Sequence, residues 1–492
     1  MKRAIPAALP ALFLAGCNMA PAYHRPEMAA PPPASFKEEP GWSVAVPSDA
    51  VARGEWWGLF NDPVLDGLER KVAVTNQNVA VARATYQAAR ALVIVQRSAL
   101  FPTITGTASG THSDSFSGGS ATGSSSTTSS GTTTSTSSGS RFALGIGASW
   151  EPDLWGRLGN GVKQAKASAE ASAGDLANAT LSAQGELATD YIQLRGDDAL
   201  RDLLDRTIVA YKRSLTITQN KYKSGTVALS DVYQAQTTLS NAVASRQDLD
   251  RQRAQLEHAI AVLAGENPST FSIAPDVWRP VVPAIPSVMP AALLQRRPDV
   301  AAAERRVAAA NANIGIQRAA YFPDVTLSGS ANTSGSTLGQ LFSAATSLWS
   351  LGASGVMTLL DFGARHGQVL QARAQFDEAA ATYRQTVLTA FQQAEDYLVA
   401  TRVLADVTRS RIEAADAATR AEVIAQNQYK SGIIDFSSVV VAQTAAYSAR
   451  QTQISAVLDQ QTAAIALIQA IGGHWTSDPI AQMATTAGPA PK

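Results

Sequence analysis

Few residues in this chain are placed to do chemistry, and they lie far apart. The five histidines are spread over the whole sequence: His24, His112, His258, His366 and His474. None stands at metal-ligand spacing from another histidine. Paired carboxylates such as Asp197-Asp198 and Glu395-Asp396 fall in helical sequence, where a solvated helix face explains them. No glycine loop followed by a lysine is present to cradle phosphate. The sequence therefore predicts no enzyme activity, no cofactor and no metal site.

The single cysteine, Cys17, lies in a short motif near the N-terminus. Lys2 and Arg3 precede a short apolar stretch, which ends in Leu14-Ala15-Gly16-Cys17 with the small residues that a signal peptidase needs. The motif resembles a bacterial lipobox and predicts a signal peptide over residues 1–16, with a lipid on Cys17. The alternative is a chance cysteine in an ordinary signal peptide. Asn18, in place of an aspartate, implies export to the outer membrane. A lone cysteine excludes an intrachain disulfide.

The chain repeats itself once at long range. Tyr222-Lys223-Ser224-Gly225 returns as Tyr429-Lys430-Ser431-Gly432, an offset of 429 − 222 = 207 residues. Phe101-Pro102 returns as Phe322-Pro323 at 322 − 101 = 221, because the first copy carries a longer Ser/Thr/Gly tract. Such a duplication predicts two equivalent halves. The expected organisation is a tether and equatorial segment at 17–62, a first repeat at 63–270, a proline-rich linker at 271–290, a second repeat at 291–473 and a tail at 474–492.

Four segments alternate with a period of two residues, which is typical of strands with one apolar side. They lie at about 101–110, 141–151, 322–332 and 348–358. Phe142, Leu144 and Ile146 share one side in the second segment. Apolar-out, polar-in strands of about ten residues are the signature of a transmembrane barrel, although a soluble sheet with one wet face has the same pattern. Four strands are too few to close a barrel, because the smallest have about eight, so the barrel interpretation requires an oligomer.

Long helical segments separate the strand pairs. A first helical region begins after Asp62-Pro63 and runs to Ala99. The other expected helices are 157–223 and 230–264 in the first repeat, and 298–320, 365–430 and 436–471 in the second. The 63 residues from Gln368 to Lys430 contain no glycine or proline, and at about 1.5 Å per residue they would extend about 95 Å. Gly225 and Gly432 fit the left-handed residue that ends a helix, and Ser230 and Asp435 or Ser437 are expected to cap the returning helices.

Composition excludes one class of partner. Forty basic and forty acidic residues cancel, and no basic stripe stands out, so nucleic acid is not an expected ligand. Only 16% of the residues are charged, yet no run of about 18 apolar residues is long enough to span a bilayer as a helix.

Several motifs in one order carry a family resemblance. They are the lipobox, Trp56-Trp57 with Phe60 and Asp62-Pro63, the Arg296-Arg297-Pro298-Asp299-Val300 block with Glu304, Tyr321-Phe322-Pro323, and the paired Tyr-x-x-Gly turns. Together they resemble the TolC-like outer-membrane efflux family, in its lipoprotein branch that serves resistance-nodulation-division pumps. The resemblance covers nearly the whole mature chain.

The resemblance implies a mixed α+β membrane protein and a homotrimer. Four strands from each of three chains would form one 12-stranded transmembrane β-barrel, continuous with a long periplasmic α-helical coiled-coil barrel. The implied partners are a periplasmic adaptor (membrane fusion) protein, an inner-membrane resistance-nodulation-division pump and membrane lipid. The implied function is a passive outer-membrane conduit for small-molecule export. Two alternatives stay open: an outer-membrane component of a protein or polysaccharide export system, and a lipid-tethered periplasmic coiled-coil scaffold.

The resemblance also assigns roles to the helix tips. Tyr429 and Asp231 match a tyrosine and an acidic residue that are linked and help to hold the tunnel shut, with packing of Tyr429 inside its own coil as the alternative. Tyr222 and Asp435 complete the expected periplasmic gate. The turns expected to dock the adaptor are Ser224-Gly225-Thr226 and Ser431-Gly432-Ile433. Positions that are acidic in some family members are Ser438 and Val441 here, and Ile434 replaces a charged residue. An acidic ring is therefore not carried over.

Overall fold

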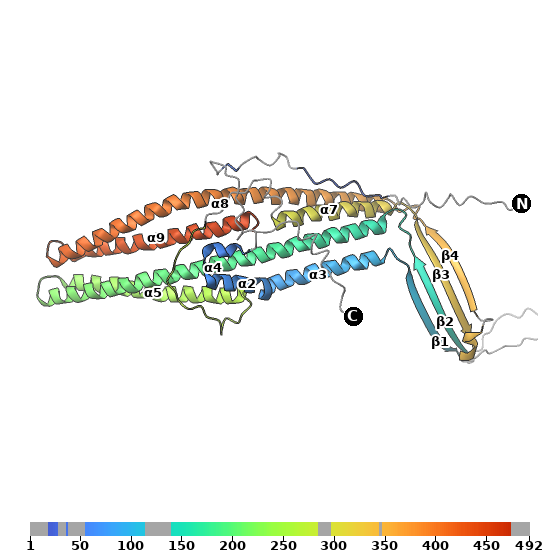
Figure 1. The fold of residues 1–492 in the computed structure, drawn as a ribbon, viewed down its shortest axis with the longest axis horizontal. Helices are drawn as coiled ribbons and strands as arrows, with labels where there is room; N and C mark the ends of the chain where they lie inside the picture. Colours follow the sequence, from blue (N-terminus) through green and yellow to red (C-terminus); the bar gives the residue numbers. More distant parts are fainter. Residues whose placement is uncertain are drawn as a thin grey trace, which may run out of the picture. The chain divides into compact units, whose positions relative to one another are not determined.

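The computed structural model describes residues 18–27, 36–37, 55–113, 139–283, 297–343 and 347–473. The predicted signal peptide, Cys17, the centre of the Ser/Thr/Gly tract, residues 284–290 of the proline-rich linker and the C-terminal tail lie outside the described residues. The described chain folds into long helices and one antiparallel sheet (Figure 1).

A shared order of main elements occurs twice along the chain: helix, two strands, a long helix and a returning helix. The first copy contains the short helix η2 (Trp56–Phe60), α2 (Pro63–Thr75), α3 (Gln77–Ser98), β1 (Thr103–Ser113), β2 (Gly139–Trp150), α4 (Arg157–Lys223) and α5 (Leu229–Leu263). The second contains α7 (Pro298–Ala319), β3 (Asp324–Gly335), the short helix η3 (Leu338–Phe342), β4 (Ser347–Val356), α8 (Ala364–Lys430) and α9 (Phe436–Ala470). The long helices α4 and α8 each have 67 residues, so the two repeats match in their longest element.

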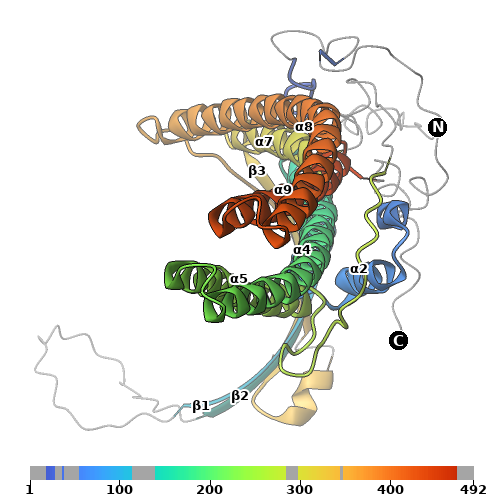
Figure 2. The same ribbon diagram turned by 90° about the vertical axis from the view of Figure 1, so that its left-hand side faces the viewer.

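The described chain divides into two compact units, each built from both repeats. One contains Arg90–Ala167 and Ala308–Asp377 and holds the sheet; the other contains Arg25–Ala89, Ser168–Val307 and Glu378–Lys492 and holds most of the helical residues. Within the helical unit, α4 with α5 and α8 with α9 form two hairpins, which Figure 2 shows end on.

Sequence-local signals explain where the first helices begin. The side chain of Asp62 accepts hydrogen bonds from the backbone N–H groups of Val64 and Leu65, at 2.9 and 3.2 Å, and so caps α2. Pro63 stands at the first helical position, where its missing N–H costs nothing. The aromatic side chains of the preceding η2 pack with α2 against α4 and α5. The Trp-Trp-x-x-Phe and Asp-Pro motifs are therefore anchors of the helical core.

The helical region predicted from residue 63 to Ala99 is interrupted, which the sequence analysis missed. Asn76 separates α2 from α3 with an extended backbone. Its side-chain oxygen accepts from Val79 N at 3.1 Å, while its side-chain nitrogen donates to the Leu263 carbonyl at 2.8 Å. One buried side chain thus starts α3 and satisfies an end carbonyl of α5, which offsets the lost helical hydrogen bonds.

The Arg-Arg-Pro-Asp block has a comparable structural role in the second repeat. The guanidinium of Arg297 forms two hydrogen bonds with the Asp299 carboxylate, at 3.1 and 2.7 Å. It also donates to Gln393 Oε1 in α8 at 2.9 Å and to the carbonyl of Ala470, the last residue of α9, at 3.1 Å. A planar group with five donors suits this task, because one side chain can then join the beginning of α7 to two other helices.

Candidate functional site

The first candidate site is the four-stranded sheet, whose strand order is β1-β2-β3-β4 with every pair antiparallel. Its register sorts the side chains by face, since directly paired residues point to the same side. Ile104 pairs with Ala148, while Ile146 pairs with Ala331 and Ala331 with Trp349. These residues form one apolar face of the sheet. Phe142 and Leu144, which were predicted to share a side with Ile146, lie on this face. The side chains of Trp349 and Leu351 are 74% and 80% exposed.

The opposite face of the sheet is polar and almost uncharged. Thr107 pairs with Gly145 and Gly145 with Asn332, and Ser330 pairs with Ser350 at a hydroxyl–hydroxyl distance of 2.9 Å. Gly145 leaves room for its neighbours, because a Cβ there would lie 2.9 Å from Thr107 Oγ1 and would displace the Asn332 side chain. This face therefore offers many hydrogen-bonding groups and little charge.

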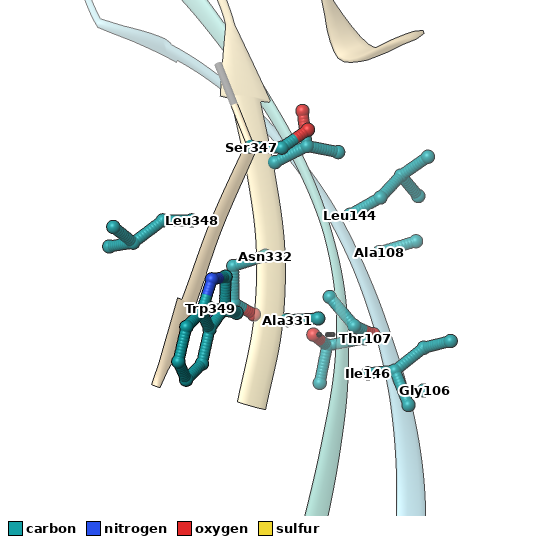
Figure 3. Close-up of a pocket in the computed structure, with 12 residues that line it drawn as sticks. Gly106, Thr107, Ala108, Leu144, Ile146, Ala331, Asn332, Ser347, Leu348 and Trp349 are labelled. Atoms are coloured by element: carbon teal, nitrogen blue, oxygen red, sulfur yellow. Dashed lines mark hydrogen bonds between the residues drawn. The ribbon is translucent and has the colours of Figure 1, made fainter. Parts of the chain in front are cut away.

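A shallow hollow of about 700 Å³ lies on the sheet, lined by residues from all four strands (Figure 3). In one cross-strand row, the small Ala331 lies between the larger side chains of Ile146 and Trp349. The hollow is therefore a gap between bulky side chains on an exposed sheet, and it contains no cluster of titratable groups.

The two outer strands of the sheet each have one unpaired edge among the described residues. β1 pairs only with β2, and β4 pairs only with β3. Each outer strand therefore presents a row of backbone N–H and C=O groups that can pair with another strand.

Among the described residues, two other features are absent: a membrane-spanning helix and a metal-binding cluster. No described helix has the length and hydropathy of a membrane-spanning helix. Across the described ranges, no group of three or more His, Cys, Asp or Glu side chains is arranged to hold a metal ion.

The second candidate site is the pair of hairpin turns. Gly225 and Gly432 have φ of +73° and +78°, the left-handed region that favours glycine. In each turn, the glycine and its successor return hydrogen bonds to the last helical turn: Thr226 N donates to Lys221 O at 2.9 Å, and Ile433 N donates to Gln428 O at 2.9 Å. Both long helices thus end in the same glycine-dependent motif, as the sequence predicted.

The returning helices begin differently from each other. Asp435 caps α9: its carboxylate accepts from Ser438 N at 2.9 Å and from the hydroxyls of Ser438 and Ser437. These hydrogen bonds, led by that from the Ser438 side chain, hold the pKa of Asp435 below its usual value. The predicted cap of α5 by Ser230 is wrong. Ala228 occupies that position without a side-chain bond, and α5 begins at Leu229, so Ser230 already lies inside the first turn.

The two equivalent tyrosines have diverged in environment. Tyr429 is 5% exposed and packs with Phe436 and Val439 from α9 and with Leu215 from α4, whereas Tyr222 is 43% exposed. The hydroxyl of Tyr429 lies 3.4 Å from Thr218 Oγ1. Burial raises the pKa of Tyr429, and the nearby Asp231 carboxylate adds to this rise. The hydrogen-bond partner of the phenol within the described chain is Thr218 and not Asp231.

Sequence reasoning missed two residues of this cluster, Thr218 and Lys221. The Lys221 ammonium donates to the backbone carbonyl of Tyr429 at 2.7 Å and lies 3.9 Å from the centroid of its ring. The available signal was a break in the repeat, because the position equivalent to Lys221 is Gln428 (221 + 207 = 428).

Comparison with known proteins shows the family of this chain. The family model described as "Outer membrane efflux protein" matches residues 69–266 and 289–473. The chain belongs to the outer membrane efflux protein family. It is 30% identical over 470 residues to a probable efflux pump outer membrane protein, TtgC, of Pseudomonas putida, covering 95% of each chain. It is also 30% identical to the toluene efflux pump outer membrane protein TtgI of the same species, covering 94% of this chain and 97% of that protein.

A solved structure agrees with the sequence relatives. The outer-membrane channel OprN superposes with a TM-score of 0.78 at 28% identity, covering 93% of this chain and 100% of that one. The fold is therefore that of the TolC-like outer-membrane channels, and the chain is the outer-membrane channel component of an efflux pump. This confirms the family expected from the sequence motifs, and the family is one of conduits.

Proposed function

We propose that this protein works as a homotrimer, in which β4 of one copy pairs with β1 of the next. Three sheets of four strands would then close a 12-stranded barrel with its apolar face toward lipid and its Thr/Ser/Asn face toward water. The observation that carries the proposal is the sheet itself, with two unpaired edges and an exposed apolar face. An exposed apolar face is unfavourable in water and suits contact with lipid. The unpaired edges are not stable in a bilayer, because unpaired backbone groups cost several kcal/mol each in hydrocarbon, and closure of the barrel satisfies them.

The proposed passage is passive. Its polar face carries hydroxyls, glycines and an amide, which hydrogen-bond to water and give no deep charged pocket to retain a cargo. Selectivity and energy would come from an inner-membrane resistance-nodulation-division pump, joined to the channel by a periplasmic adaptor. The cargo would be small apolar organic molecules such as the toluene for which the TtgI pump is named.

The proposed periplasmic gate lies at the hairpin ends. Tyr429 and Asp231 would hold the α8–α9 hairpin near α5, Tyr222 would occupy the exposed equivalent position, and Asp435 would fix the direction in which α9 leaves its turn. The support is the burial of Tyr429 and the influence of Asp231 on its pKa. The capping bonds of Asp435 are the support for its positioning role.

The proposed adaptor contacts are the two turns, formed by Ser224, Gly225 and Thr226 and by Ser431, Gly432 and Ile433. A Cβ added at either glycine would meet open space, so the turns leave room for a partner to approach the backbone closely. The side chain of Ile433 is 70% exposed, which provides an apolar contact at the second turn. A lipid on Cys17 would anchor the N-terminus to the outer membrane, in addition to the barrel.

Reconstitution tests the proposal directly. The purified protein should migrate as an oligomer that heating converts to a monomer, and it should give single-channel currents in a planar lipid bilayer. Residues 139–150 and 324–335 are the inner strands of the sheet, so a variant that lacks both is the non-conducting control. A folded protein that remains monomeric and never conducts would favour the scaffold alternative and exclude a channel.

A further inference from the structure

The strongest unassigned feature is the ammonium group of Lys221, in the last turn of α4. It donates a hydrogen bond to the carbonyl oxygen of Tyr429 at 2.7 Å and lies 3.9 Å from the centroid of the Tyr429 ring. Lys221 belongs to the α4–α5 hairpin and Tyr429 to the α8–α9 hairpin, so this contact joins the ends of the two hairpins.

Three attractions converge on this one cation. The Tyr429 carbonyl is in the final turn of α8, where it also accepts a bond from Gly432 N at 3.1 Å. The carbonyl end of a helix carries the negative pole of its dipole, which favours a positive charge there. The face of an aromatic ring attracts a cation as well. Because Tyr429 is 5% exposed and half-enclosed by Phe436 and Val439, the ring is held in a fixed position beneath the ammonium group.

The internal repeat provides a comparison within the same chain. In the second copy, Gln428 replaces the lysine, and the tyrosine of the first copy, Tyr222, is 43% exposed. The α4–α5 hairpin supplies the cation, and the α8–α9 hairpin supplies the ring and the carbonyl. The repeat does not form the same contact in the opposite direction, because the second copy has no lysine at the equivalent position. Lys223 and Lys430 are equivalent positions of the repeat, where they end α4 and α8, and both are exposed. The asymmetry singles out Lys221 from the other lysines of the turns.

We propose that Lys221 is a positioning residue that latches the α8–α9 hairpin to the α4–α5 hairpin of the same protomer, and that this latch must be released when the periplasmic end of the channel widens. The proposal rests on the proposed trimeric channel and deepens it by naming a gate contact. It differs from the Tyr429–Asp231 link, because it uses the ring face and the backbone carbonyl of Tyr429 and leaves its hydroxyl free for Thr218.

The test compares four variants by resting conductance in planar bilayers. Lys221→Met keeps the length of the side chain and removes its charge, so the resting conductance should rise several-fold. Lys221→Arg keeps a cation that can bind the carbonyl and the ring, and it should remain within about twofold of wild type. Lys221→Gln, the residue of the second repeat, keeps a donor but loses the cation and should be intermediate. Lys223→Met is the matched control on the same helix end and should not differ from wild type.

The outcomes separate this inference from the proposed function. Wild-type protein that does not conduct contradicts the channel itself. If wild type conducts and assembled Lys221→Met conducts no more than wild type, the latch is wrong while the channel stands. If Lys221→Arg opens the channel as much as Lys221→Met, then side-chain packing and not charge holds the hairpins, and the proposed latch is again wrong. Heat-modifiable migration establishes for each variant that the oligomer has formed.

Discussion

At the scale of single residues, the protein contains a carboxyl group in an unusual position. Glu69 in α2 is fully buried, and neither of its oxygens has a hydrogen-bond partner among the described residues. Burial raises the pKa of Glu69 well above its ordinary value, and the neighbouring Asp66 carboxylate adds to the rise. The folded protein therefore favours the protonated form of Glu69.

Stability should depend on pH through this residue. The contribution of protonated Glu69 is fully present below the pKa of the unfolded chain, about 4.3, and is lost as the pH rises toward the higher folded pKa. We expect Glu69→Gln to raise the melting temperature relative to wild type at pH 8, and to do so by less at pH 5. Glu55→Gln, at an exposed position, serves as the control. Equal differences at both pH values would show that Glu69 is already ionised in the folded state.

The phenol of Tyr429 gives a second prediction at this scale. Thr218→Val and Tyr429→Phe each remove one side of the same contact, a neutral hydrogen bond worth about 0.5–1.5 kcal/mol. Each change should raise the resting conductance modestly, and the double variant should conduct no more than the larger of the two. Conductance increases that add would place the two hydroxyls in separate interactions.

At the scale of elements, the two hairpins differ in how their returning helices begin. Asp435 caps α9 in the second hairpin, and the first hairpin has no such cap. Asp435→Ala should therefore lower the stability of the second hairpin by about 1 kcal/mol. Hydrogen exchange of the backbone amides of residues 436–440 would show this loss as faster exchange, with residues 229–233 of α5 as the internal reference.

The same turns give a matched test of adaptor docking. Gly432→Asp and Gly432→Asn introduce side chains of the same size, and both residues tolerate a left-handed backbone better than most. If the turn docks the adaptor, both variants should weaken crosslinking to it, and the aspartate should weaken efflux further if the added charge opposes the contact. The trimer should still assemble and conduct. Full crosslinking and full drug resistance with Gly432→Asp would move the docking surface away from this turn.

At the scale of the whole molecule, assembly and anchoring should be separable. Cys17→Ala should abolish lipidation and leave the oligomer able to insert and conduct, because paired strands and not acyl chains would span the bilayer. Mass spectrometry of the mature N-terminus and bilayer recordings measure the two properties. An unmodified N-terminus in the wild-type protein would remove the lipoprotein proposal and leave the channel proposal intact.

The sequence by itself determined the elements that depend on local signals. Alternation along the chain predicted which side chains share a face of the sheet, because strand geometry fixes that period. Gly225 and Gly432 marked the ends of the long helices, since only a left-handed residue completes that hydrogen-bond pattern. The motifs in their order along the chain identified the family, because many weak signals in one order are together specific.

Only the tertiary structure decided the contacts between distant segments. The break at Asn76 depends on a carbonyl of α5 that lies 187 residues away. Lys221 and Thr218 gained their roles from a tyrosine more than 200 residues further along the chain. The missing cap at Ser230 reflects a helix that begins one residue earlier than its sequence suggested. Local patterns determine secondary structure, but the partner of a polar side chain is set by which helices pack together, and that information is not periodic in the sequence.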